Sequence, residues 1–150
     1  MKMMLPVVVM VTVAAASVSP QQRFLAEPRS VLMAEGAAAV RLDCAVADMA
    51  GSLQWTRDDF GLGTDRALPG YDRYRMAGED PGTWDLEITG LRLEDEGVYQ
   101  CQVLATHSAP PLRSDYATLT VLAPPQPPVL TSGPRLAARE GGTAMVQCIR

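Results

Sequence analysis

The feature that most constrains how this chain can fold is the run Leu93–Cys101, which joins a short acidic turn to an alternating segment. Asp95, Gly97, Tyr99 and Cys101 occupy every second position of this run. That spacing is typical of a β-strand, because successive side chains of a strand point to opposite faces of its sheet. We therefore expect Tyr99 and Cys101 to face a hydrophobic core.

Cys44 is the partner that the sequence offers for Cys101, and Trp55 lies between the two cysteines. The order Cys, Trp and then Asp-x-Gly-x-Tyr-x-Cys is the signature of an immunoglobulin-like sandwich, in which a tyrosine corner lies two residues before the second cysteine. We therefore expect an all-β sandwich of variable or intermediate type. A Cys44–Cys101 disulfide should lie in its core with Trp55 packed against it, and Tyr99 should form the tyrosine corner.

Arg73 and Asp95 lie at positions that pair across the base of such a sandwich. A partly buried ion pair between a guanidinium and a carboxylate is directional, so this pair would fix the turn that carries Tyr99. Such a pair has two interpretations, a binding site and a structural clamp, and we favour the clamp. The residues predicted to define the fold are thus Trp55, Arg73, Asp95, Gly97 and Tyr99.

The rest of residues 20–122 shows the alternation expected of a single sandwich domain. About seven to nine short strands separated by turns fit this stretch, and none of it has a helical apolar period of useful length. The clearest strands are predicted at Val40–Val46, Leu53–Arg57, Trp84–Ile88 and Tyr116–Leu122, with a glycine-spaced turn at Asp58–Gly63.

Residues 1–19 have the pattern of a secretory signal peptide. Lys2 supplies a positive start, Leu5–Ala16 is apolar apart from Thr12, and small residues follow at Ala14–Ser17. The alternative is a membrane anchor, but a span needs about 20 apolar residues and this run is shorter. Secretion would place the cysteines in an oxidising compartment, where a disulfide is the expected state.

A second domain is predicted to begin after a proline-rich linker. Residues 123–128 read Ala-Pro-Pro-Gln-Pro-Pro, a composition that favours the stiff polyproline conformation. Residues 129–150 repeat the pattern that leads to Cys44, because a Glu-Gly pair precedes a valine and then Cys148. We interpret them as the incomplete start of another domain of the same kind, with the partner of Cys148 beyond Arg150. A free thiol is the alternative.

The composition argues against an enzyme, a metal site, a cofactor and a nucleic-acid partner. The formal net charge is −4 and Lys2 is the only lysine, so the basic patch that binds nucleic acid is missing. His107 is the only histidine, which leaves little from which to build a catalytic triad or a histidine metal site. The acidic clusters at Asp58-Asp59 and Glu94–Glu96 lack the spaced oxygen ligands of a calcium loop, so we interpret them as solvated turns.

Alternation also predicts an outward face, made of the residues that alternate with the buried Trp, Tyr and Cys. This face carries Gln, Thr and Tyr without Lys, Glu or Asp, and no N-linked sugar covers it because the chain contains no Asn. An uncharged, hydrogen-bonding face with apolar margins resembles an interface. The alternative is an ordinary polar sheet face. The predicted contact residues are Gln54, Thr56, Gln100, Gln102 and Tyr116, with Phe60 and Leu62 at one margin.

At Gln54–Thr64 the sequence reads Gln-Trp-Thr-Arg-Asp-Asp-Phe-Gly-Leu-Gly-Thr, and it resembles the first immunoglobulin domain of the irregular chiasm family, which includes Roughest, Kirre and the Neph proteins. The resemblance covers about residues 22–128. Further matching segments are Gly70–Tyr74, Leu86–Ile88, Tyr99–Val103 and Leu119–Pro125. The sequence departs from the family at Ala37–Ala39 and in the proline-containing loop Ser108–Leu112.

The resemblance implies a single-pass cell-surface protein of type I that reaches the plasma membrane through the secretory pathway and acts in cell adhesion and recognition. Its partners would be same-family ectodomains, bound homophilically, or nephrin-type ectodomains, bound through the sheet that carries the Gln-Trp strand. The processes implied include myoblast fusion, axon guidance and synapse targeting. Two alternatives stay open: the ligand-binding ectodomain of a signalling receptor, and a secreted immunoglobulin-type binding protein.

Overall fold

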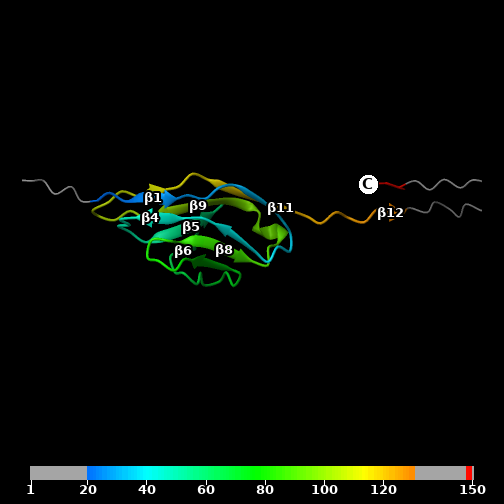
Figure 1. Ribbon diagram of the computed structural model, residues 1–150, viewed down its shortest axis with the longest axis horizontal. Coiled ribbons are helices and arrows are strands. Elements are labelled where there is room, and N and C mark those ends of the chain that lie inside the picture. The colour runs from blue at the N-terminus through cyan, green and yellow to red at the C-terminus, as the bar shows by residue number, and fades with distance from the viewer. Residues whose placement is uncertain (1–19, 131–147, 150) are drawn as a thin grey trace, which may run out of the picture.

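The computed structural model describes residues 20–130 and 148–149 of the chain. The predicted signal peptide, residues 1–19, lies outside the described residues, as does most of the predicted second domain, residues 129–150. The part that is described in full is a two-layered β-sandwich over residues 20–122, followed by an exposed segment without regular secondary structure at Ala123–Pro128 (Figure 1). No helix in the described ranges is long and apolar enough to span a membrane.

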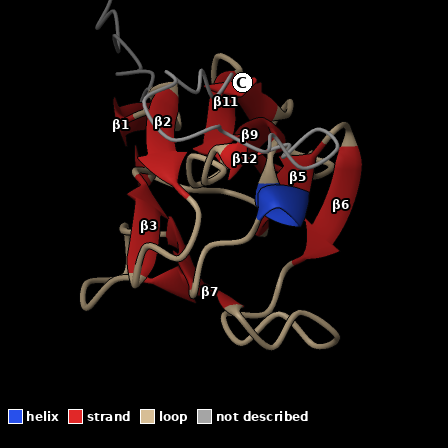
Figure 2. Cartoon of the chain, turned by 90° about the vertical axis from the view of Figure 1, so that its right-hand side faces the viewer, coloured by secondary structure: helices blue, strands red, loops and turns tan. Residues whose placement is uncertain are grey.

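The larger sheet forms one layer of the sandwich, with strand order β2-β11-β9-β5-β6 and with β10 attached to β9. All its pairs are antiparallel except β11 with β2, which is parallel. Figure 2 shows these strands side by side, with β6 at one edge. The strands are β2 (Val31–Ala34), β5 (Leu53–Arg57), β6 (Phe60–Gly63), β9 (Gly97–Val103), β10 (Leu112–Arg113) and β11 (Ala117–Leu122).

The second layer is a three-stranded antiparallel sheet with the order β3-β8-β7, accompanied by the separate pair β1-β4. A single 3₁₀ turn, η1 (Leu93–Asp95), leads into β9. Beyond the sandwich, β12 (Val129–Leu130) pairs with β13 (Cys148–Ile149). The strands of the second layer are β1 (Arg23–Ala26), β3 (Ala39–Leu42), β4 (Ala45–Ala47), β7 (Tyr74–Ala77) and β8 (Asp85–Thr89).

The core between the layers is centred on the residues that the Cys-Trp-Tyr-Cys signature marks. Cys44, Trp55, Tyr99 and Cys101 are all 0% exposed, and Cys44 is disulfide-bonded to Cys101. Trp55 lies opposite Cys101 in the ladder between β5 and β9. The predicted all-β immunoglobulin-like sandwich and its disulfide are therefore confirmed. The disulfide closes the loop between Cys44 and Cys101 and so restricts the unfolded chain, which contributes roughly 4 kcal/mol to stability by the chain-entropy argument.

The predicted single strand at Val40–Val46 is wrong, because the structure divides it into β3 and β4. At the break, the backbone N–H of Cys44 donates to Oδ1 of Asp85 at 2.7 Å instead of to a strand carbonyl. The same buried carboxylate accepts a 2.8 Å hydrogen bond from Nε of Arg41. The Asp85 side chain thus replaces a ladder acceptor at the break. Beyond it, β4 pairs with β1 on one side and stays beside Gly82–Thr83, just before β8, on the other.

The predicted glycine-spaced turn at Asp58–Gly63 is also wrong in extent, since only Asp58 and Asp59 form the turn. Both have left-handed backbones, with φ of 48° and 67°, which suits a two-residue hairpin and which aspartate tolerates better than most residues. The remaining residues, Phe60–Gly63, form the edge strand β6. A bulge interrupts its pairing with β5 between Trp55 and Thr56.

Candidate functional site

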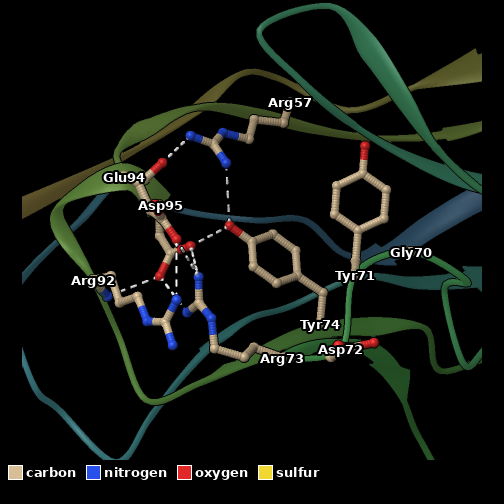
Figure 3. Close-up of a pocket in the computed structure, with 9 residues that line it drawn as sticks. All are labelled: Arg57, Gly70, Tyr71, Asp72, Arg73, Tyr74, Arg92, Glu94 and Asp95. Atoms are coloured by element: carbon tan, nitrogen blue, oxygen red, sulfur yellow. Dashed lines mark hydrogen bonds and ion pairs between the residues drawn. The ribbon is translucent and has the colours of Figure 1, made fainter.

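The sandwich base holds the ion pair that the sequence predicted between Arg73 and Asp95. The two guanidinium nitrogens of Arg73 each donate to one oxygen of Asp95 at 2.7 Å (Figure 3). Asp95 is 0% exposed and also accepts hydrogen bonds from the Tyr74 hydroxyl at 2.5 Å and from the Arg92 backbone N–H at 2.8 Å. The Tyr99 hydroxyl donates to the backbone oxygen of Asp95 at 2.6 Å, so the tyrosine corner is anchored to the same residue.

The protonation states of Asp95, Tyr74 and Tyr99, at the base of the sandwich, are set by their surroundings. Burial alone raises the pKa of Asp95, but hydrogen bonds from Arg73, Tyr74 and Arg92 outweigh it and hold that pKa below its usual range. Burial and the hydrogen bond to Asp95 raise the pKa of Tyr74, and burial raises the pKa of Tyr99. An ionised Asp95 carboxylate beside the protonated Tyr74 hydroxyl, with the protonated Tyr99 hydroxyl on the Asp95 backbone oxygen, is suited to holding structure.

A hollow of about 550 Å³ lies against the Arg73–Asp95 pair, but protein atoms already bind the arginines that line it. Arg57 donates to the backbone oxygen of Glu94 and, at 3.3 Å, to the Tyr74 hydroxyl (Figure 3). Arg92 contacts the Glu94 carboxylate at 3.4 Å. Among the residues that the structure describes, no group of three or more His, Cys, Asp or Glu could hold a metal ion. The geometry therefore supports a clamp at the base rather than a ligand site.

The outer face of the larger sheet brings the predicted glutamines together. Gln54 on β5 lies directly opposite Gln102 on β9, and Thr56 lies opposite Gln100. Nε2 of Gln102 donates to Oε1 of Gln54 at 3.0 Å, so the two amides form one rung across the strands. Both residues are half-buried and their outer sides reach solvent. The alternation argument thus identified this rung from the sequence.

The next rung along is less accessible than the sequence suggests. Thr56 is 6% exposed and Gln100 is 9% exposed, although both alternate with core residues. The side-chain amide of Gln100 donates to the backbone oxygen of Ser114 at 2.8 Å, and the Thr56 hydroxyl donates to the backbone oxygen of Gln100 at 3.5 Å. Neighbouring side chains and the segment before β11 cover this rung. The Thr56–Gln100 rung lies beneath the exposed residues of the face and offers a partner little accessible surface.

Tyr116 is the exposed aromatic residue of this face, at 58% exposure. Its hydroxyl donates to Oδ1 of Asp59 at 2.9 Å, and this hydrogen bond raises the pKa of the Tyr116 phenol. The contact brings a carboxylate to the margin of the face. The interpretation of the face as free of acidic residues is therefore wrong at this point, because Asp59 comes from a turn that alternation along strands does not describe.

Gly61 is a residue of the face that sequence reasoning missed. A Cβ atom at Gly61 would lie 2.4 Å from Nε2 of Gln54, so the glutamine side chain lies directly over this glycine. Gly61 lies between Phe60, which is 78% exposed, and Leu62, which is buried. Because Gly61 faces the glutamines, its neighbours face the opposite side of β6. Leu62 is 5% exposed and belongs to the core, so its prediction as a contact residue is wrong.

The outer face of the other sheet has a different chemistry. Arg75 binds Glu87 at 2.6 Å across β7 and β8, and Arg41 binds Asp85 at 2.8 Å across β3 and β8. Both arginines are largely exposed, whereas the Asp85 and Glu87 carboxylates are largely covered. The two faces of the sandwich thus differ. One carries ion pairs across its strands, whereas the other presents amides, hydroxyls and an aromatic ring, with Arg113 opposite Gln102 and the Asp59 carboxylate at its margin.

Comparison with known proteins agrees with this geometry. Residues 22–120 match the immunoglobulin I-set domain family. The irregular chiasm C-roughest protein of Drosophila melanogaster is 44% identical over 130 residues, which are 85% of this chain and 17% of that protein. The crystal structure of Duf (Kirre) D1 superposes with a TM-score of 0.66 at 45% identity, over 69% of this chain and 98% of that chain. The chain belongs to the irregular chiasm family.

A second irregular chiasm structure supports the same assignment. The crystal structure of Rst D1-D2 has a TM-score of 0.72 to this chain at 46% identity, and the match covers 76% of this chain and 55% of that one. The family resemblance read from Gln54–Thr64 is therefore confirmed. The chain spans about one sixth of the length of the curated irregular chiasm relatives that it matches.

Proposed function

We propose that this chain is the recognition region of a cell-surface adhesion protein and that it binds other ectodomains through the outer face of β5, β9 and β11. Membership of the irregular chiasm family supports a role in adhesion and recognition. The observation that carries the proposal is the Gln54–Gln102 rung. Among the described residues its face carries no ion pair across strands, whereas the opposite face carries Arg41–Asp85 and Arg75–Glu87.

The proposed partners are ectodomains of the same family, in homophilic contact, and nephrin-type ectodomains. A rung of two amides supports such partners because each amide offers both donors and an acceptor, the groups that form the direct hydrogen bonds of a protein interface. The contact surface we propose consists of Gln54, Gln102 and Tyr116, with Thr56 and Gln100 supporting it from below. A single contact through these few residues is weak, so clustering of many copies on the membrane would supply the avidity.

We further propose that the full-length protein enters the secretory pathway and is a single-pass type I protein of the plasma membrane, with this region outside the cell. The processes it would serve are those of cell–cell contact, such as fusion or the targeting of axons and synapses. The disulfide of this domain is consistent with an oxidising compartment.

The test is aggregation of cells that display the full-length protein. Gln54→Glu keeps the acceptor for the Gln102 amide, so the rung and the fold are preserved while one negative charge enters the face. We expect this variant to lose aggregation with same-family and nephrin-type partners. The matched control is Ala39→Glu, which adds the same charge at an exposed position of β3 on the other sheet. Normal aggregation by correctly displayed Gln54→Glu cells would contradict the proposal.

A further inference from the structure

The loop between β9 and β10 carries a serine that the proposed contact surface does not use. Residues 105–111 read Ala-Thr-His-Ser-Ala-Pro-Pro, and Ser108 is exposed. Nε2 of Gln22 donates to the backbone oxygen of Pro110 at 2.7 Å, which ties this loop to the segment just before β1. Figure 1 shows the linker leaving the sandwich at the end away from β1, so the loop and the linker lie at opposite ends.

The two hydroxyls of this loop have different surroundings. Oγ1 of Thr106 accepts hydrogen bonds from the backbone N–H groups of Ser108, at 3.3 Å, and of Ala109, at 3.1 Å, so this hydroxyl holds the turn. Within the described residues, the Ser108 hydroxyl contacts only the Thr106 hydroxyl, at 3.2 Å. Thr106 is half-buried, whereas Ser108 is exposed. Ser108 therefore offers the accessible hydroxyl of the pair.

The prolines that follow Ser108 prepare its backbone for an enzyme. Proline fixes its own φ and favours an extended conformation in the residue before it, which here are Ala109 and Pro110. A segment that is already extended loses little conformational entropy when it enters a binding groove. The other exposed serines and threonines of the described chain have no proline within the next three positions; they are Ser30, Ser52, Thr64, Thr89 and Thr118.

We propose that Ser108 is a site of O-glycosylation, at which an enzyme of the secretory pathway attaches an N-acetylhexosamine. Serine and threonine in proline-containing segments are typical acceptors of mucin-type sugars. The Ser108 oxygen forms a bond to the anomeric carbon of a nucleotide-activated sugar, and the bond from that carbon to the diphosphate breaks. The nucleoside diphosphate leaves with the electron pair and the hydroxyl proton is released. This inference rests on the secretory route proposed above.

The surface beside Ser108 has room for the sugar. A hollow of about 520 Å³ opens there, within the range of ~300–1,000 Å³ that is typical of small-molecule sites. Pro110 and Pro111 give the hollow apolar walls, whereas Gln21 and Asp48 supply polar groups. A sugar ring uses both, because its C–H groups pack on apolar side chains and its hydroxyls form hydrogen bonds. A sugar on Ser108 can thus lie against the protein without displacing the loop.

The test is peptide mapping of the full-length protein, displayed on cultured animal cells and recovered from their surface. Trypsin cleaves after Arg92 and Arg113, and the peptide 93–113 contains Thr106 and Ser108 as its only threonine and serine. We expect mass spectrometry to find this peptide with the added mass of at least one N-acetylhexosamine and to locate the sugar on Ser108. The peptide contains no Asn, so no N-linked sugar contributes to that mass.

Three variants test the acceptor and its context. Ser108→Ala should abolish the modification, because position 108 then has no hydroxyl. The matched control is Ser108→Thr, which keeps a hydroxyl at the same place and should remain modified. The double variant Pro110→Ala/Pro111→Ala keeps Ser108 but frees the backbone after it, so we expect the modified fraction of the peptide to fall severalfold.

An unmodified peptide from the displayed wild type, a sugar on Thr106, or a hexose in place of the N-acetylhexosamine would overturn the proposal. So would a Ser108→Ala peptide that keeps its sugar, or a proline variant that is modified as fully as the wild type. Displayed protein that aggregates cells without a sugar on Ser108 contradicts this inference alone. Glycosylated protein that does not aggregate cells contradicts the proposed adhesion alone, and protein that never reaches the surface contradicts both.

Discussion

The hydroxyl of Tyr116, the residue just before β11, donates a 2.9 Å hydrogen bond to Oδ1 of Asp59 in the β5–β6 turn. Strand β9 lies between β11 and β5 in the sheet, so the Tyr116 side chain must cross above β9 to reach Asp59. The buried rung of Thr56 and Gln100 lies at the same level of the sheet. Tyr116 therefore covers that rung and holds its own ring in one orientation on the proposed contact surface.

Loss of this hydrogen bond should weaken recognition without removing the aromatic surface. In Tyr116→Phe the ring stays but can rotate, so a partner must immobilise it on binding. We expect the dissociation constant for a family ectodomain to rise about two- to tenfold, the cost of ordering one side chain. Surface plasmon resonance on immobilised partner measures this change.

The control for this prediction is Asp59→Asn. Its Oδ1 still accepts the hydrogen bond, and asparagine tolerates the left-handed backbone of Asp59, where φ is 67°. We expect it to bind like the wild type. If Tyr116→Phe also binds like the wild type, the tether to Asp59 has no role in recognition.

Gly61→Ala should displace Gln54 while leaving the fold intact. The new Cβ would meet the far end of a flexible side chain at 2.4 Å, so the glutamine moves and its hydrogen bond with Gln102 is lost. We expect partner affinity to fall about two- to tenfold, and the free energy of unfolding to change by less than about 1 kcal/mol. Titration calorimetry and urea unfolding measure the two quantities.

A double-mutant cycle shows whether Gly61 acts through Gln54. In a Gln54→Ala background there is no amide to displace, so Gly61→Ala should have no further effect on affinity. An equal loss in both backgrounds would show that Gly61 contacts the partner itself or supports the strand.

The core and the glutamine rung were predictable because they depend on sequence periodicity alone. Cys44, Trp55, Tyr99 and Cys101 are identified by their order and spacing, and a strand's two-residue period then places Gln54 and Gln102 on one face. Such arguments need only the local backbone to be extended. The pair Arg73–Asp95 was also predictable, since the fold class itself defines where its base lies.

The missed features depend on contacts between segments that are distant in sequence. The bulge between Trp55 and Thr56 lies beside β6, where Leu62 joins the core although it was predicted at the margin of the binding face. The strand through Cys44 ends because Asp85, from another strand, takes its backbone N–H. The exposure of Gln100 is reduced by Ser114 and its neighbours. The periodicity of a single strand cannot predict these contacts, because the contacting residues come from other segments.

Truncation of Asp95 should unfold the base of the sandwich. Asp95→Ala leaves the Arg73 guanidinium and the Tyr74 hydroxyl without their acceptor in a buried site. Removing one member of such a pair costs about 3–5 kcal/mol, and we expect the lower end because the Arg73 side chain is 22% exposed. Secreted yield and the urea midpoint should both fall sharply.

Glu94→Ala is the matched control for Asp95→Ala. Its carboxylate contacts the same Arg73 guanidinium at 3.2 Å, but the Glu94 side chain is 67% exposed. A solvent-exposed ion pair contributes at most about 1 kcal/mol, so this variant should be secreted almost normally. Equal losses in the two variants would mean that burial of the Asp95 carboxylate is not what stabilises the base.

Acid should remove the contribution of Asp95 to stability. Burial alone raises the pKa of Asp95, but the hydrogen bonds from Arg73, Tyr74 and Arg92 outweigh it, so its pKa in the folded chain lies below its usual value. A carboxyl whose folded pKa is depressed stabilises the fold above its unfolded pKa of about 3.9, and this stabilisation is lost as the pH falls through the folded pKa.

The pH dependence of Asp95→Asn tests this linkage directly. At pH 7 this variant should unfold at a lower urea concentration than the wild type, because it lacks the ionised acceptor. Below about pH 4 the Asp95 carboxyl of the unfolded wild-type chain takes up a proton while that of the folded chain stays ionised, so the difference between the two urea midpoints should shrink as the pH falls toward the folded pKa. A difference that stays constant from neutral to strongly acidic pH would show that the charge of Asp95 does not stabilise the sandwich. Its contribution would then come only from hydrogen bonds that do not depend on that charge.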